Sequence, residues 1–164
     1  MGLFDFTKKI FGNKYDKDLK EITPTINKIK EVYPSIQALS NDELRSKTVE
    51  FKTIIKEGTA SIYNEIEELK NSTKNDSLSP SEKEGVFTQI DELEVKIVST
   101  TEEILETILP EAFSVIKETA SRFNNGEIEV TANNFDKDLA SRYSNVTIKG
   151  DKAIFNNKWI AAGN

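Results

Sequence analysis

Cysteine and histidine are both absent from the 164 residues of this chain. Their absence excludes disulfide bonds, a thiolate nucleophile, histidine acid–base catalysis and metal sites built from cysteine or histidine. The chain also lacks any apolar run approaching the roughly eighteen residues of a membrane-spanning helix. No secretory signal is present, because the first lysines follow apolar residues and no long apolar core comes after them. The lack of cysteine is compatible with a cytosolic protein.

Motifs for nucleotide and metal binding are missing as well. No G-x-x-x-x-G-K-[ST] loop occurs, so no residue of this chain can be assigned to the phosphates of ATP. The acidic central segment lacks the spacing of a calcium-binding loop. Neighbouring carboxylates such as Glu67 and Glu68 do not face each other on a helix, which disfavours shared acid–base chemistry. We therefore predict no catalytic, cofactor-binding or metal-binding residues here.

The charge is unevenly distributed along the chain. The net charge is −6, which weighs against nucleic-acid binding. From Thr59 to Leu109 there are twelve acidic residues and four lysines, a net charge of −8. Met1–Lys20 holds five lysines and three aspartates, a net charge of +2. The sequence therefore predicts an acidic, solvated central segment and a mildly basic start.

The start of the chain has the pattern of an amphipathic helix. Apolar residues from Leu3 to Phe11 fall on one side of a helical wheel, and Lys8 and Lys9 lie opposite. Such a helix can lie in a membrane interface and attract anionic lipid. From the residues alone, packing on the rest of the protein or on a second copy is favoured, because only two lysines lie within the helix. The candidate membrane or channel contacts are Phe4, Phe6, Lys8, Lys9, Ile10 and Phe11.

Helical spacing continues through most of the chain. A first stripe runs from Leu19 to Tyr33; we expect Pro24 to restart or kink this helix and Tyr33-Pro34 to close it. Capping boxes at Ser40–Glu43 and Ser79–Glu82 predict two further helix starts.

Within these two helices, glycine and proline predict further breaks. We expect Gly58 to end the first helix and a second stretch to continue to about Lys70, before the polar turn Asn71–Ser79. The next helix should run to Ile108, and Pro110 should open another that ends at Asn124-Asn125-Gly126. The apolar stripe of this αα-hairpin can zip its two arms together or recruit a partner helix.

The last forty or so residues change character. Glu127–Thr131 alternates like a strand, and Val146–Phe155 reads as a β-hairpin around Gly150. Between them, Phe135, Leu139 and Tyr143 make a one-sided helical turn. The predicted fold class is mainly α: an elongated helical bundle with a long antiparallel αα-hairpin and a small β-hairpin near the C-terminus.

Three segments together resemble SecA, the preprotein translocase ATPase. They are KKIFGNKYDKDLK (Lys8–Lys20), LSNDELRSKTVEFK (Leu39–Lys52) and ILPEAFSVIKETASR (Ile108–Arg122), in the order expected for the family. The resemblance implies an N-terminal fragment that precedes the nucleotide-binding motor. Typical members have few residues between the last two segments and reach the motor soon afterwards, so we expect two insertions here. The expected division is a lead-in over residues 1–58, an inserted acidic hairpin over 59–107, a returning helix over 108–126 and a β-containing insert over 127–164.

The resemblance also carries expectations about function. The full-length parent would use ATP and Mg²⁺ to export preproteins through the Sec channel, whereas this fragment would bind neither. The fragment would contact the channel or the anionic membrane surface, or would self-associate as a homo-oligomer; preprotein would engage parts of the parent outside this chain. The location would be cytoplasmic, peripheral to the inner face of the cell membrane. The alternative is a self-contained helical coiled-coil interaction protein.

Overall fold

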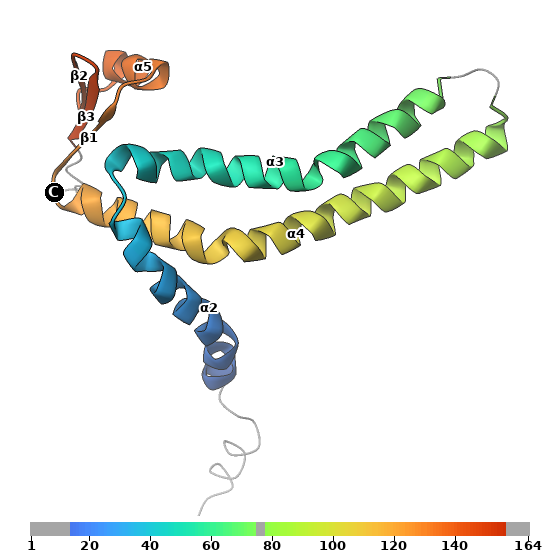
Figure 1. Cartoon of the computed structure of the whole chain (residues 1–164), viewed down its shortest axis with the longest axis horizontal. Helices are drawn as coiled ribbons and strands as arrows, with labels where there is room; N and C mark the ends of the chain where they lie inside the picture. The colour runs from blue at the N-terminus through green and yellow to red at the C-terminus, as the bar shows by residue number, and fades with distance from the viewer. Residues whose placement is uncertain (1–13, 75–77, 157–164) are drawn as a thin grey trace, which may run out of the picture.

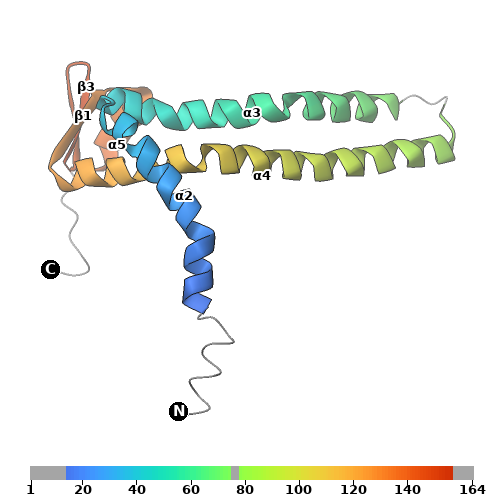
Figure 2. The same cartoon turned by 60° about the horizontal axis from the view of Figure 1, so that its bottom comes forward.

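A computed structural model describes residues 14–74 and 78–156 of the chain. The molecule is mainly α, with a small sheet near the C-terminal end of the described part, and the predicted fold class is confirmed. Two long helices lie side by side as an antiparallel hairpin, α3 and α4, and a third helix, α2, crosses its base (Figure 1). The sheet and a short helix, α5, sit at the same base, and the far end of the hairpin projects away from them (Figure 2).

The first described helix, α2, extends over Lys14–Gln37 and passes through both Pro24 and Pro34. Of the two alternatives predicted at Pro24, the restart is therefore wrong, and so is the predicted closure at Tyr33-Pro34. A proline inside a helix loses one backbone hydrogen bond and crowds the preceding turn. At Pro34, packing of the second half of α2 against α4, with Ile36 fully buried, offsets that cost.

Helix α3 extends over Asn41–Ser72 and starts where the first capping box predicts. The Ser40 hydroxyl oxygen accepts a hydrogen bond from the Glu43 backbone, and the Glu43 carboxylate accepts one from the Ser40 backbone at 2.7 Å. The predicted end at Gly58 is wrong, because α3 continues through this residue without a break. Gly58 faces α4 instead, and a Cβ atom placed there would lie 2.5 Å from the Ile104 Cδ1 atom.

Helix α4 extends over Pro80–Asn124 and begins at the second predicted capping box, with Ser79 as its N-cap. The predicted break at Pro110 is wrong. Pro110 is buried within the continuous helix, and the Ser114 hydroxyl donates to the Pro110 carbonyl at 2.8 Å. The tertiary contacts of this turn, which lies against α2, outweigh the intrinsic cost of the proline. The predicted stop near Asn125 is confirmed, since this residue is the C-cap.

The two arms of the hairpin pack through the apolar stripe, as predicted. Ile62 and Ile66 of α3 are buried against Ile90 of α4. Partly buried residues extend this cluster toward the end of the hairpin: Leu69, Val86, Leu93 and Ile97. A second cluster, formed by Ile36, Leu44 and Val115, holds the base where α2, α3 and α4 meet.

The sheet has three antiparallel strands in the order β1-β3-β2. Strands β2 (Val146–Lys149) and β3 (Lys152–Asn156) form the predicted hairpin, whose turn contains Gly150 at a φ of +62°. Strand β1 (Glu127–Thr131), also predicted, pairs with β3 so that Ile128 lies opposite Phe155. Helix α5 (Asn134–Arg142) connects β1 to β2. The pairing of β1 with β3 places the inner face of the sheet beside the base of the hairpin.

Candidate functional site at the base of the hairpin

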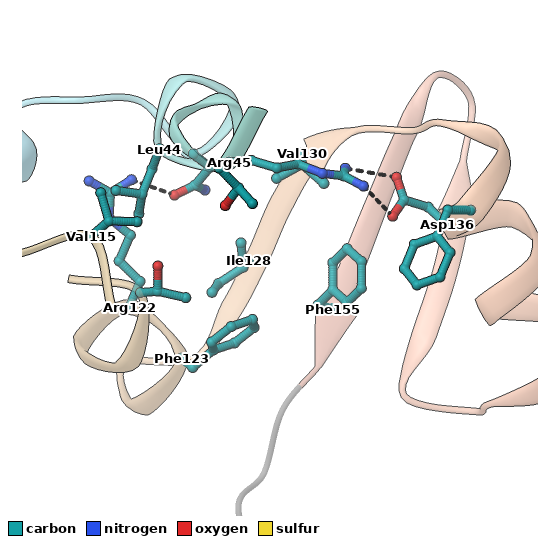
Figure 3. A pocket seen from close by; sticks show the side chains of 13 residues that line it. Leu44, Arg45, Val115, Arg122, Phe123, Ile128, Val130, Asp136 and Phe155 are labelled. Carbon is teal, nitrogen blue, oxygen red and sulfur yellow. Dashed lines mark hydrogen bonds and ion pairs between the residues drawn. The ribbon is translucent and has the colours of Figure 1, made fainter. Parts of the chain in front are cut away.

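A cavity of about 280 Å³ opens where α3, α4, α5 and the sheet meet. Figure 3 shows side chains from all these elements around it. Most of its lining is apolar, and a few polar groups stand at its rim. The lining residues are Asn41, Leu44, Arg45, Thr48, Val115, Thr119, Arg122, Phe123, Ile128, Val130, Phe135, Asp136 and Phe155.

The apolar wall of the cavity comes mainly from α3, α4, β1 and β3. Leu44 of α3 and Val115 of α4 belong to the core at the base of the hairpin. Ile128 and Val130 are the buried positions of β1, whose burial alternates along the strand as expected for a one-sided sheet. Phe155 of β3 packs against the same cluster. The cavity therefore lies between two apolar clusters, the one at the base of the hairpin and the one on the inner face of the sheet.

Arg45 and Asp136 form a bidentate ion pair across this junction (Figure 3). The two guanidinium nitrogens donate to the two carboxylate oxygens at 2.8 Å each. The Asp136 side chain is fully buried and also accepts from the Asn133 backbone at 2.9 Å. Burial raises the pKa of this carboxyl, but the hydrogen bonds from Arg45 and Asn133 outweigh burial, so its pKa lies below the ordinary value. The pair fixes α5 to α3.

Arg122 makes the second polar connection. Its side chain donates to Glu118 on α4 and to Asn41 on α3, both at 2.8 Å. It also donates to the Leu39 carbonyl at 2.7 Å, so one guanidinium joins α4 to the link between α2 and α3. The hydrogen bond from Arg122 lowers the pKa of Glu118, although burial opposes this effect. Glu118 in turn accepts from the Tyr33 hydroxyl of α2 at 3.0 Å.

A third connection ties the first turn of α3 to β1. The Asp42 carboxylate accepts from the Thr131 backbone N–H and from the Thr131 hydroxyl, both at 2.8 Å. These two bonds lower the pKa of Asp42. The Asn41 amide donates to the Glu129 carbonyl at 3.0 Å. The sheet is thus attached to the hairpin through directional polar contacts around an apolar cavity.

This arrangement indicates a structural junction between the hairpin, α5 and the sheet. The Asp136 carboxylate, which lines the cavity, and the Glu118 carboxylate, which pairs with the lining residue Arg122, are held ionised by arginines. Neither is therefore suited to carry a proton near neutral pH. Within residues 14–74 and 78–156, no group of three or more His, Cys, Asp or Glu side chains could hold a metal ion.

The structure does not test the predicted contact residues. Phe4, Phe6, Lys8, Lys9, Ile10 and Phe11 all lie outside the described residues. Sequence reasoning identified none of the residues that line the cavity as a site. No local signal marked Arg45 or Arg122, because both have polar neighbours on their helices and such arginines are more often solvated. Long-range pairing with Asp136 and Asn41 cannot be read from spacing.

Comparison with known proteins identifies the family. The SecA DEAD-like domain family matches residues 7–143. The SecA protein translocase subunit of Parabacteroides distasonis is 48% identical over 165 residues, which cover 100% of this chain and 14% of that protein. The chain belongs to the SecA family. Its SecA relatives in Phocaeicola vulgatus and Bacteroides fragilis are 48% and 45% identical over 100% of the chain, which covers 15% of each. No solved structure matches.

The alignments with these relatives include the hairpin and the sheet. The chain spans about one-seventh of the length of its SecA relatives. Because each alignment extends over 165 or 166 residues and includes the whole chain, these relatives carry segments that correspond to the α3–α4 hairpin and to the sheet. None of the described helices is both long and apolar enough to cross a membrane.

Proposed function

We propose that this chain is the N-terminal portion of a SecA-type protein translocase subunit and acts there as a contact region. The observation that carries the proposal is the 48% identity to a protein translocase subunit over the full chain. In the parent, ATP and Mg²⁺ would bind a motor outside these residues, since the chain has no phosphate-binding loop. Family membership favours this function over a self-contained coiled-coil interaction protein.

Within the parent, the chain divides into the four parts expected from the resemblance. Residues 1–58 and 108–126 form the lead-in to the motor, and residues 59–107 and 127–164 are the two insertions. Helix α3 runs unbroken past residue 58, and α4 runs unbroken past residue 108. The hairpin would therefore be a rigid extension of the lead-in and not a separately hinged domain.

The direct test of parentage is the gene beyond the codon for Asn164. A reading frame that continues into a G-x-x-x-x-G-K-[ST] loop supports the proposal. A stop codon at that position contradicts it. Export of preprotein through the Sec channel, at the inner face of the cell membrane, would be the activity of the continued protein and not of these residues alone.

The N-terminal segment would make the membrane contact. Lys8 and Lys9 supply positive charge, which contributes about 1 kcal/mol per lysine near an anionic surface and is screened by salt. Phe4, Ile10 and Phe11 supply apolar groups for the interface. The chain should bind weakly to vesicles containing phosphatidylglycerol, less so at high salt, and should lose this binding when Met1–Gly12 is deleted.

A matched pair of variants separates this contact from general charge attraction. Replacing Lys8 and Lys9 by serine should reduce vesicle co-sedimentation, whereas replacing the exposed Lys28 and Lys30 of α2 should reduce it much less. If deletion of Met1–Gly12 leaves vesicle binding unchanged, the segment is a packing element and the membrane contact is disproved.

Self-association is the other proposed contact. The first half of α2 carries the exposed apolar residues Leu19, Ile22 and Ile26, which lie beyond the part of α2 that packs on α4. Burial of apolar area contributes roughly 25 cal/mol per Å². Sedimentation velocity of the chain at rising concentration measures this contact. A strict monomer at high concentration contradicts it.

A further inference from the structure

One side of α4 combines exposed apolar residues with carboxylates along the projecting part of the hairpin. At 100° per residue, the positions concerned fall within about 120° of the helix surface between Glu84 and Glu106. The side chains that pack on α3, including Ile90 and Ile97, occupy the adjacent side. We call this surface the acidic–apolar face.

The apolar members of the face are unusually open to solvent. Phe87 is 54% exposed, Val95 70%, Val98 58% and Leu105 44%. They are eight, three and seven residues apart in sequence, which places all four within about 80° of the helix surface. A stripe of this kind on an amphipathic helix normally faces a packing partner. Among the described residues, neither α2 nor the sheet covers it, because both lie at the base (Figures 1 and 2).

The charged members of the face all have the same sign. They are Glu84, Asp91, Glu94, Glu102 and Glu106, each exposed, and no lysine or arginine of α4 lies within the face. Glu94 pairs with Lys70 of α3 at 3.6 Å. Within the described part of the chain, the other four carboxylates form no ion pair. The face therefore offers apolar anchors surrounded by uncompensated negative charge.

We propose that the acidic–apolar face docks a basic amphipathic helix of another polypeptide. The apolar side of such a helix would cover the line from Phe87 to Leu105, and its lysines or arginines would flank that line and meet the carboxylates. Residues 84–106 extend over about 33 Å, so the partner segment needs roughly six turns. The surface is separate from the membrane contact proposed for the N-terminal segment and from the cavity at the base.

The charges argue against a second copy of this chain as the occupant. Two acidic–apolar faces packed together would place carboxylate against carboxylate, which is destabilising. The geometry argues against the chain's own basic start. Helix α2 leads away from the hairpin toward Lys14, whereas the face lies on the projecting part of α4 (Figure 2). A basic partner in trans satisfies both the apolar and the charged members of the face.

The test uses the 164-residue chain and a fluorescein-labelled helical peptide of leucine and lysine, about 22 residues long. Binding is followed by fluorescence anisotropy, and a peptide with glutamate in place of lysine serves as the charge control. The leucine–lysine peptide should bind, with an affinity that falls as salt rises, and the glutamate peptide should not. Failure of the lysine peptide to bind, or equal binding of both peptides, overturns the proposal.

Matched variants locate the contact. Replacing Asp91 and Glu102 by lysine should weaken binding roughly tenfold. Replacing Glu92 and Glu103 by lysine, at exposed carboxylates that flank the face on the same helix, makes the same change in net charge and should weaken binding far less. Equal losses in the two double variants mean a diffuse electrostatic attraction and overturn the proposal.

A second pair of matched variants tests the apolar residues of the face. Val98→Ser should weaken peptide binding, whereas Val49→Ser, at a comparably exposed valine of α3, should not. Two further results would overturn the proposal. One is self-association of the chain that Val98→Ser abolishes, which would make a second copy the occupant. The other is peptide binding that appears only after deletion of Met1–Asn13, which would make the chain's own start the occupant.

Discussion

Gly58 of α3 lies so close to Ile104 of α4 that a Cβ atom at residue 58 would be 2.5 Å from the Ile104 Cδ1 atom. The glycine therefore permits the close approach of the two helices and does not end α3. Gly58→Leu should lower the free energy of unfolding by about 1–3 kcal/mol, because the added side chain overpacks the interface. Urea unfolding followed by circular dichroism measures the effect.

The matched control for this substitution is Gly85 on α4. No atom lies within 4 Å of a Cβ placed at Gly85. Gly85→Leu should raise the stability by up to about 1 kcal/mol, because leucine has the higher helix propensity. Stabilisation by both substitutions would show that the hairpin arms do not pack closely at Gly58.

The second prediction concerns the core of the projecting hairpin. Ile90 is buried between Ile62 and Ile66. Ile90→Ala should reduce the free energy of unfolding by about 2–4 kcal/mol, since it removes buried methyl groups and leaves a cavity. Val95→Ala, a truncation at an exposed position of the same helix, should change it little. Equal small effects in a thermal melt would mean that the two arms are not zipped together.

The third prediction addresses the polar junction. Arg45→Ala should cost about 2–3 kcal/mol, because it leaves the fully buried Asp136 carboxylate without its charged partner. Arg142→Ala removes the exposed partner of Asp138 and should have little effect, as is usual for surface pairs. Urea unfolding of both variants measures the two losses of stability. Equal losses would contradict the prediction, because they would mean that the Arg45–Asp136 pair contributes no more than the exposed pair.

The fourth prediction is a dependence on pH. The pKa of Asp42 in the folded chain lies below its ordinary value of 3.8, mainly because of hydrogen bonds from Thr131. The ionised carboxylate therefore stabilises the fold above pH 3.8, and this contribution disappears as the pH falls through 3.8 to the lower folded pKa. Asp42→Ala should have a lower melting temperature than the unmodified chain at pH 6. The gap should shrink as the pH drops below 3.8; a constant gap would contradict the assignment.

The fifth prediction is that this chain does not bind nucleotide. It contains no phosphate-binding loop, so titration with Mg-ATP should give no heat of binding in a calorimeter. The same titration of the continued parent should give a clear signal. Micromolar binding by the chain alone would contradict its interpretation as a contact region that precedes the motor.

The starts of the long helices could be predicted from sequence because capping is local. Ser40 with Glu43, and Ser79 with Glu82, satisfy backbone groups within one turn, and both helices begin at the next residue. The ends could not be predicted at Gly58 and Pro110. The local penalties of roughly 1 and 3 kcal/mol for these residues are smaller than the packing of a continuous helix against its neighbours.

The cavity and its polar rim could not be predicted from the sequence, for a different reason. Arg45 and Asp136 are 91 residues apart, and each has a polar neighbourhood typical of a surface residue. The pairing of β1 with β3, which skips over β2 in the chain, and the contacts of β1 with α3 together bring α5 to the base of the hairpin. Periodicity predicts which face of an element is buried, but not which distant element covers it.

The unbroken course of α4 has a mechanical consequence. A helix of 45 residues is about 67 Å long, and its last third is fixed to α2, α3 and the sheet, whereas its first part carries the acidic–apolar face. Such a helix is a lever arm. A tilt of about 5° at the fixed end would displace the free end of the remaining two-thirds, about 45 Å long, by roughly 4 Å. A small movement at the base, which leaves the contacts there intact, would therefore displace a polypeptide bound near the tip by a larger distance.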